Sequence, residues 1–250
     1  MITANKIEVC FTPNNFHLYD NASSIVVVID VLRATSAICT ALFHGVEKII
    51  PVSSIEEAKA WQAKGYLVAA EREGVVVRGF EFGNSPFSYM TEKVKGKEIV
   101  ITTTNGTLAL EVARSSYKVV AGCFLNIDIL YHWLLKEDRN IILLCSGWKN
   151  KFNLEDTLFA GALVNRLLQS GKFMTECDSA MASNYLYEQA KSDLYAFLDC
   201  SSHRKRLEKL SLEKDIRYCL TPNLTPVIPI LEGNGLVKLQ PAERLINYKK

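Results

Sequence analysis

The chain has 250 residues, 48% of them hydrophobic, which is enough to bury the core of one large domain or two small ones. Lysine and arginine exceed aspartate and glutamate by only 29 − 27 = 2, and no long run of one charge occurs. This balance argues against nucleic acid or a membrane surface as the partner.

Short apolar strands alternate with helical periodicity up to Cys145. The expected strands are Ile7–Phe11, Ile25–Ile29, Lys48–Val52, Leu67–Ala70, Glu98–Thr102, Lys118–Ala121 and Asn140–Cys145. The expected helices are Ala34–His44, Ile55–Lys64, Gly106–Arg114 and Ile127–Lys136. This alternation predicts an α/β fold, a three-layer α/β/α arrangement with a largely parallel sheet and right-handed crossovers.

The pattern changes after Gly147. Helical periodicity is nearly continuous from Leu154 to Leu210, and an Asn-Gly turn then precedes a short terminal strand. We expect an added C-terminal helical region on one side of a single domain, residues 1–250, with any subdivision near 147–153. The basic run His203–Arg206 is predicted to be a solvated helical face.

The cysteines and the apolar stretches indicate the compartment. Seven cysteines without a C-x-x-C spacing favour reduced thiols over a disulfide framework or a zinc site. No apolar stretch has the length of a membrane span, and residues 1–14 contain none of signal-peptide length. We therefore expect a soluble cytoplasmic protein, and the sequence is compatible with a homo-oligomer.

Polar residues follow the first long apolar run directly. Ile25–Ile29 is uninterrupted and β-branched, as in a strand buried on both faces, and it ends in Asp30, with Arg33 three residues on. Open α/β sheets bind ligands outside the carboxyl ends of their strands, so this stretch predicts a site. Asp30 alone is explained equally well as a helix N-cap.

Two further strand ends are polar. Glu71 and Arg72 follow Ala70, and the later turn Gly83–Pro86 contains Asn84 and Ser85. The acid and the arginine are also explained by a surface ion pair of little energy. Thr102–Thr107 enters the next helix with Thr103, Thr104, Asn105 and Gly106, whose donors and helix dipole suit an oxyanion, although a threonine-rich cap explains them too.

The fourth polar strand end is Cys145–Trp148, which contains Ser146 and Gly147 and precedes the helix that starts with Glu155 and Asp156. Two acids at a helix start suit the dipole without any ligand. Taken together, however, the four strand ends supply carboxylates for Mg²⁺ and arginines for phosphate or carboxylate groups. The combination predicts metal-assisted chemistry on a small anionic substrate.

Four ordered motifs resemble the 2-phosphosulfolactate phosphatase family. They are Asp30–Ser36 (DVLRATS), Gly79–Pro86 (GFEFGNSP), Thr102–Thr107 (TTTNGT) and Phe152–Thr157 (FNLEDT). With Ser201–His203 and Pro226–Pro229 the resemblance runs from Val26 to Ile230, most of the chain. It implies a Mg²⁺-dependent α/β enzyme that hydrolyses the phosphate ester of 2-phosphosulfolactate to 3-sulfolactate and phosphate, a step on a route to coenzyme M.

The chain departs from the family pattern in three places. It has Ala70–Gly74 (AEREG) where the family commonly has Gly-Glu-Arg-Gly-Gly, and Cys145–Trp148 (CSGW) where the family has a Cys-Ala-Gly-Thr-like turn. Glu81 replaces the usual aspartate before the Gly-Asn-Ser-Pro turn. We expect Glu73 and Trp148 to affect the choice of substrate more than the reaction class, so a different phosphorylated hydroxy acid is an alternative substrate.

The hypothesis for the site assigns a role to each group. Mg²⁺ is bound by carboxylates drawn from Asp30, Glu71, Glu155 and Asp156 and bridges the phosphate. Arg33 and the Thr103–Gly106 loop hold the phosphate oxygens, Arg72 binds the carboxylate or sulfonate, and further substrate contacts come from Asn84, Ser85, Ser146 and Gly147. The nucleophile is a metal-activated water or Asp30 itself, and His203 is either the acid for the leaving alkoxide or merely exposed.

Two other classes remain open. A haloacid-dehalogenase-type phosphatase would need a second aspartate two residues after Asp30, where this chain has Leu32. A non-catalytic relative that binds a small anionic metabolite on the same loops is the other, and release of inorganic phosphate distinguishes it from an enzyme.

Overall fold

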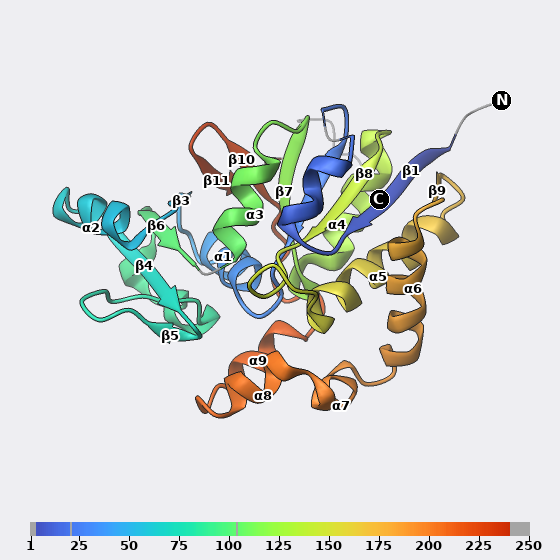
Figure 1. The fold of residues 1–250 in the computed structure, drawn as a ribbon. Helices are drawn as coiled ribbons and strands as arrows, with labels where there is room; N and C mark the ends of the chain where they lie inside the picture. The colour runs from blue at the N-terminus through green and yellow to red at the C-terminus, as the bar shows by residue number, and fades with distance from the viewer. Residues whose placement is uncertain (1–3, 21, 104, 241–250) are drawn as a thin grey trace, which may run out of the picture.

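One mixed sheet of 11 strands forms the centre of the molecule (Figure 1). The computed structural model describes residues 4–20, 22–103 and 105–240. The strands are β1 (Asn5–Cys10), β2 (Ile25–Ile29), β3 (Lys48–Pro51), β4 (Leu67–Arg72), β5 (Val75–Val76), β6 (Glu98–Thr102), β7 (Lys118–Gly122), β8 (Ile141–Cys145), β9 (Phe173–Met174), β10 (Pro229–Glu232) and β11 (Gly235–Lys238). Their order in the sheet is β5-β4-β6-β3-β11-β10-β7-β2-β8-β1-β9.

Helices connect the strands and cover the sheet. The α-helices are α1 (Ala34–Phe43), α2 (Ile55–Ala63), α3 (Gly106–Ala113), α4 (Ile127–Glu137), α5 (Leu154–Gln169), α6 (Asp178–Ala190), α7 (Leu194–Phe197), α8 (Ser202–Glu208) and α9 (Glu213–Cys219). Short 3-10 turns are η1 (Pro13–Leu18), η2 (Pro86–Tyr89), η3 (Glu92–Val94), η4 (Phe124–Asn126) and η5 (Leu198–Cys200). The predicted α/β fold with a largely parallel sheet is confirmed.

The sheet consists of two parallel groups joined by an antiparallel hairpin. The β4-β6-β3 group and the β7-β2-β8-β1-β9 group are each parallel, and β10 and β11 lie between them. Ile230 of β10 pairs with Val120, and Leu236 of β11 pairs with Ile49. The expectation of one short terminal strand was therefore wrong, because Gly233 adopts a positive φ of 58° and the chain turns back into a two-stranded hairpin.

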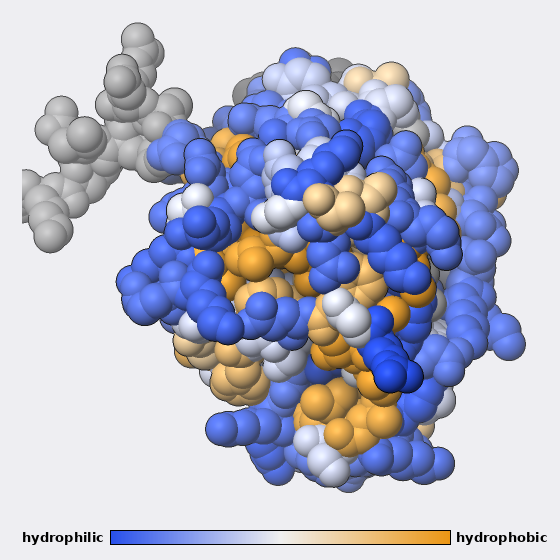
Figure 2. Space-filling view, turned by 90° about the vertical axis from the view of Figure 1, so that its left-hand side faces the viewer, coloured by the Kyte–Doolittle hydropathy of each residue, from blue (hydrophilic) through white to orange (hydrophobic). Residues whose placement is uncertain are grey.

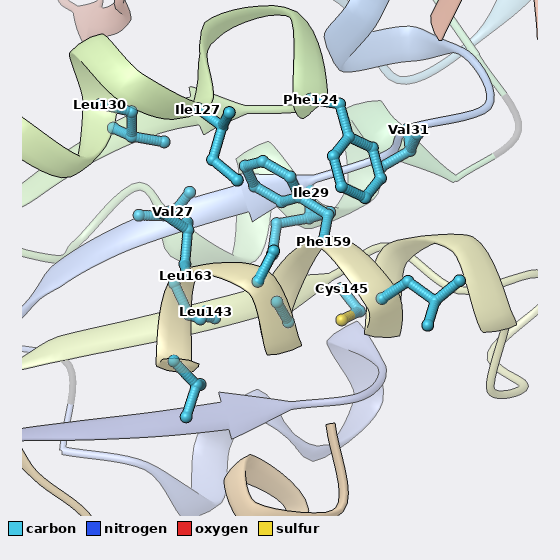
Figure 3. Close-up of a cluster of buried hydrophobic side chains, with 14 of the residues drawn as sticks. Val27, Ile29, Val31, Phe124, Ile127, Leu130, Leu143, Cys145, Phe159 and Leu163 are labelled. Atoms are coloured by element: carbon cyan, nitrogen blue, oxygen red, sulfur yellow. The ribbon is translucent and has the colours of Figure 1, made fainter. Parts of the chain in front are cut away.

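Alternating side chains of the strands fill two cores on opposite faces of the sheet. Val27 and Ile29 belong to the core that α4 and α5 cover, whereas Val26 and Val28 belong to the core that α1 and α3 cover. Figure 3 shows Ile29 among Phe124, Phe159 and their neighbours in the first core. Every residue of β2 is buried, as expected for a strand covered on both faces.

The region after Gly147 differs in part from the prediction. The helical periodicity is interrupted at β9, which adds to the sheet edge beside β1, and α6 then lies against α5. The close approach of these helices requires Gly161, since a Cβ there would lie 2.0 Å from the carbonyl oxygen of Ser183. The short helices α7, α8 and α9 form a separate group below the sheet in Figure 1.

The end of the molecule that carries α2, β4 and β5 presents a mixed surface. Figure 2 shows hydrophobic patches between hydrophilic residues on this face. Val75 and Val76 of β5 are exposed. None of the helices in the described parts of the chain is both long enough and apolar enough to cross a membrane.

Candidate active site

A pocket at the carboxyl ends of the strands brings residues from both parallel groups together. In the sheet order, β2 and β4 are six strand spacings apart, which would be ~29 Å in a flat sheet. Asp30 after β2 and Glu71 of β4 nevertheless line the same pocket, so the two strand groups must turn toward each other. The pocket is lined by Asp30, Leu32, Arg33, Glu71, Gly74, Asn84, Thr103, Asn105, Gly147, Trp148, His203 and Leu207.

Asp30 both supports the start of α1 and belongs to the pocket. Its Oδ1 accepts a hydrogen bond of 3.1 Å from the backbone N–H of Ala34, the first residue of α1. Its Oδ2 lies against Gly106, where a Cβ atom would come within 2.9 Å of it. The pKa of Asp30 is raised from its usual 3.8 to about 6. Burial is the largest cause and the carboxylates Glu71 and Glu155 add to it, whereas the Ala34 N–H and His203 oppose it.

Glu71 is held by two donors. Asn84 Nδ2 donates to Glu71 Oε2 at 2.9 Å, and the backbone N–H of Gly74 donates to Oε1. The remaining amide oxygen of Asn84, Oδ1, is buried and has no hydrogen-bond partner among the residues that the structure describes. A buried unpaired acceptor beside a carboxylate fits a water or hydroxyl of a bound ligand.

Arg33 forms hydrogen bonds with two acceptors of the protein itself. Its Nη1 lies 2.7 Å from Oδ1 of Asp215 on α9, and its Nη2 donates to the carbonyl oxygen of Gly74 at 2.9 Å. Both members of the ion pair are buried. Arg33 therefore connects α1, the turn after β4 and α9 on one side of the pocket.

The threonine loop reaches the pocket through Thr103 and Asn105. Thr103 Oγ1 accepts a hydrogen bond of 3.2 Å from the N–H of Thr107, so it caps α3. Asn105 Oδ1 accepts a bond of 3.0 Å from the N–H of Lys149. Gly106 begins α3 beside Asp30, whereas the predicted contact Thr104 lies outside the described residues.

His203 is buried in the pocket wall, so the predicted solvated face of the run 203–206 was wrong for His203 and Arg204, whereas Lys205 is exposed. Its Nδ1 pairs with Oε1 of the fully buried Glu155, and its ring lies 5.4 Å from the ring of Trp148. Arg204 is buried too, because it bonds acceptors on α7 and α8. A carboxylate that holds Nδ1 leaves Nε2 of the imidazole available to a ligand.

Asp156 lies behind the pocket and supports two loops. Its oxygens accept hydrogen bonds from the N–H of Val31 at 2.9 Å, the N–H of Gly147 at 3.2 Å and Nδ2 of Asn153 at 2.8 Å. Burial, with Asp30 and then Glu155 adding to it, holds the pKa of Asp156 well above its usual value. Asp156 therefore holds the loops after β2 and β8 in place next to the pocket.

Three other predicted contacts lie beside the lining rather than in it. Arg72 donates to the carbonyl oxygen of Glu71 at 2.7 Å and to Thr102 Oγ1 at 3.1 Å. Ser85 precedes η2, and Ser146 has a buried Oγ that no described residue bonds. The pocket also contains or contacts residues that the sequence did not point to, Leu32, Leu207 and Asp215.

The donor set fits a magnesium ion held by few protein ligands. In the described ranges no three acidic, histidine or cysteine side chains converge tightly enough to hold a metal by themselves. Asp30 and Glu71 line the pocket, whereas Glu155 and Asp156 lie outside the lining and bond His203 and backbone donors. Mg²⁺ in phosphoryl-transfer sites is typically bound by one or two carboxylates plus phosphate and water, so two carboxylates suffice.

The pocket lies at the carboxyl ends of the strands of an α/β sheet and combines acids, an oriented imidazole and a helix N-terminus. These features are typical of an enzyme that acts on a small anion. Comparison with known proteins narrows this class. The 2-phosphosulpholactate phosphatase family matches residues 10–234. The chain belongs to this family.

Individual relatives cover nearly the whole chain. A protein of Caldanaerobacter subterraneus subsp. tengcongensis, named probable 2-phosphosulfolactate phosphatase, is 40% identical over 231 residues, which are 91% of this chain and 95% of the relative. A protein of Thermotoga petrophila with the same name is 43% identical over 214 residues, 86% of this chain and 91% of the relative. A third, from Clostridium botulinum, is 34% identical and covers 86% of this chain and 92% of its own length.

Proposed function

We propose that this protein is a Mg²⁺-dependent phosphatase that hydrolyses the phosphate ester of 2-phosphosulfolactate to 3-sulfolactate and inorganic phosphate. The observation that carries the proposal is the pocket itself, in which Asp30, Glu71 and His203 from three distant segments meet the N-terminus of α3. The names of the relatives supply the substrate. A bound Mg²⁺ would offset phosphate charge and lower the pKa of a coordinated water.

Asp30 and Glu71 are the residues that would hold the ion. Both carboxyl groups are buried, so each is harder to ionise than in water, and a negative charge on one opposes ionisation of the other. The raised pKa of Asp30 reflects its burial first and the charge of Glu71 in addition. A divalent cation between them would remove this repulsion. The shared negative field favours Asp30 as a metal ligand over Asp30 as the attacking nucleophile.

The phosphate would lie at the start of α3. Thr103, Asn105 and the backbone donors of the α3 N-terminus provide hydrogen bonds and the positive end of the helix dipole. Arg33 lines the same side and adds positive charge near the equatorial oxygens, although two of its donors already bond protein acceptors. These groups position the ester and stabilise its charge, which is most of what phosphoryl transfer requires.

His203 would protonate the leaving group. In the reaction, water attacks phosphorus, the bond between phosphorus and the C2 oxygen breaks, and that oxygen takes a proton from Nε2 of His203. Glu155 holds the opposite ring nitrogen and so fixes the ring orientation and stabilises the protonated imidazole that precedes transfer. The proton lost by the attacking water restores the imidazolium by way of solvent.

The experiment is phosphate release from a panel of 2-phosphosulfolactate, 2-phospholactate and 2-phosphoglycerate. We expect hydrolysis of 2-phosphosulfolactate that stops on addition of EDTA and returns with excess Mg²⁺. Mg²⁺ should also raise the melting temperature of the wild-type protein, and less so that of Asp30→Asn, which tests the ion independently of activity. Binding of the substrate without release of phosphate would indicate the non-catalytic binder instead, and activity undiminished by EDTA would remove the metal from the proposal.

A further inference from the structure

Arg206 is the arginine beside the pocket whose guanidinium has no acceptor. It makes no hydrogen bond or ion pair to any residue that the structure describes, and its Nη2 is buried. By contrast, Arg33 bonds Asp215 and Gly74, and Arg72 bonds Glu71 and Thr102. A buried guanidinium nitrogen without a partner is costly unless an anion or water completes it.

Trp148 fixes Arg206 at the rim of the pocket. The Cζ atom of Arg206 lies 3.8 Å from the centre of the Trp148 ring, and Trp148 itself lines the pocket. Arg206 is three residues after His203 on α8, so both side chains lie on one face of that helix and both contact the same indole. The guanidinium plane is thus oriented next to the imidazole assigned to the leaving group.

The carboxylates near Arg206 form their hydrogen bonds and ion pairs with other described residues. Glu155 bonds His203, Glu71 bonds Asn84 and Gly74, and Glu73 forms its ion pair with Lys149 at 2.8 Å. These three acids attract Arg206 through space only. Burial lowers the pKa of Arg206, because its charged form is partly removed from water. A closely bound anion would compensate for this loss of solvation.

We propose that Arg206 is the specificity-determining residue that binds the sulfonate of the substrate. This inference rests on the proposed function. With the phosphate at the start of α3, the carboxylate is attached directly to the carbon that bears the ester, whereas the sulfonate is one bond further away and reaches the rim. The guanidinium fork on the indole face offers parallel N–H donors to two sulfonate oxygens.

The size of the pocket agrees with a rim that adjusts to the substrate. Its volume of about 20 Å³ holds roughly one water molecule, far less than a phosphorylated three-carbon acid. The turn around Gly74 lies against helix α8 at this rim, because a Cβ at Gly74 would lie 3.4 Å from Leu207 of α8 and 2.8 Å from Leu210 just after the helix. Arg206 lies on this helix, next to the part of the rim that a larger ligand would displace.

The test compares two substrates that differ only in the sulfonate, 2-phosphosulfolactate and 2-phospholactate. In Arg206→Met, whose chain still covers Trp148, the ratio of kcat/KM for the two substrates should fall by about 10- to 100-fold, the effect of one charge-assisted bidentate contact. Arg206→Lys should recover part of it. Lys205→Met is the matched control, because Lys205 is exposed on the same helix and carries the same charge.

Each result has one meaning. A ratio unchanged in Arg206→Met, or changed as much by Lys205→Met, overturns the assignment of Arg206. Calorimetry with the product adds a readout free of turnover: 3-sulfolactate should bind more weakly to Arg206→Met, with no such change for lactate, and equal affinity in both proteins overturns the assignment as well. A wild-type protein that binds 3-sulfolactate through Arg206 yet releases no phosphate refutes the proposed function alone.

Discussion

Arg33 and Asp215 form a buried ion pair across 182 residues of sequence, with Nη1 and Oδ1 at 2.7 Å. The pair joins the loop after β2 to α9 and places the guanidinium beside the pocket. Two buried charges are tolerated only when both are paired and hydrogen-bonded, and Gly74 supplies a further acceptor to Arg33.

Breaking this pair should destabilise the fold. Asp215→Asn leaves the Arg33 charge buried with weaker compensation, so the free energy of unfolding should fall by about 3 kcal/mol or more in urea titrations. Asp199→Asn is the control, since Asp199 is exposed in its pair with Arg204 and should cost less than about 1 kcal/mol. Equal effects of the two substitutions would contradict a structural role for the buried pair.

Asp30→Asn should stabilise the metal-free protein. The pKa of Asp30 is raised from 3.8 to about 6, so its protonated form is favoured in the fold and its ionisation costs stability as the pH rises through this interval. Two pKa units correspond to about 3 kcal/mol, which sets the upper scale of the gain above pH 6 in EDTA. The gain should shrink on acidification and vanish below about pH 4, and a gain independent of pH would contradict this origin.

The same substitution should abolish turnover. Asp30→Asn removes a proposed ligand of Mg²⁺ but keeps the acceptor for the Ala34 N–H, so circular dichroism should show an intact fold. As a metal ligand rather than a nucleophile, Asp30 should carry no phosphate when wild-type protein is acid-quenched during turnover with labelled substrate. Label retained by the wild type and absent from Asp30→Asn would establish Asp30 as the nucleophile.

The sequence was informative where a signal is local. The all-apolar, β-branched run Ile25–Ile29 favours a strand buried on both faces, which the structure shows, and the carboxyl end of such a strand places Asp30 at the ligand side of a parallel sheet. Glu71 and Thr103 follow from the same rule. Strand direction therefore anticipates that these residues lie at one edge of the sheet, whereas their meeting in one pocket depends on how the two strand groups turn toward each other.

Long-range pairings carried no such signal. Asp215 lies in a short charged helix and was not singled out from the sequence, because only the tertiary placement of α9 against Arg33 buries it. The burial of His203 was missed for the same reason, since its contacts with Trp148 and Glu155 come from distant parts of the chain and do not depend on helical periodicity. The insertion of β10 and β11 between β3 and β7 likewise depends on two pairings with residues distant in sequence, Ile230 with Val120 and Leu236 with Ile49.

His203→Gln should affect esters according to their leaving group. A general acid contributes roughly 10²- to 10⁴-fold where a poor alkoxide departs, so kcat on 2-phosphosulfolactate should fall within this range. Hydrolysis of nitrophenyl phosphate, whose leaving group needs no proton, should fall by less than about tenfold under the same conditions. Equal losses on both esters would show that His203 shapes the pocket without donating a proton.

Gly106→Ala tests the contact between α3 and Asp30. A Cβ at this position would lie 2.8 Å from Cβ of Ala34 and 2.9 Å from Oδ2 of Asp30. Alanine is favoured over glycine in helices by up to about 1 kcal/mol, so a loss of stability or activity cannot come from helix propensity. We expect kcat/KM to fall more than about tenfold, because the new methyl group must displace the carboxylate of Asp30 and so disturb its positioning.

The control for Gly106→Ala is the double variant with Ala34→Gly. Ala34→Gly removes the contact between the two methyl groups but not the contact with Asp30, so the double variant should regain melting temperature but not activity. Full recovery of activity in the double variant would show that the packing of α1 on α3, and not the carboxylate, requires glycine here.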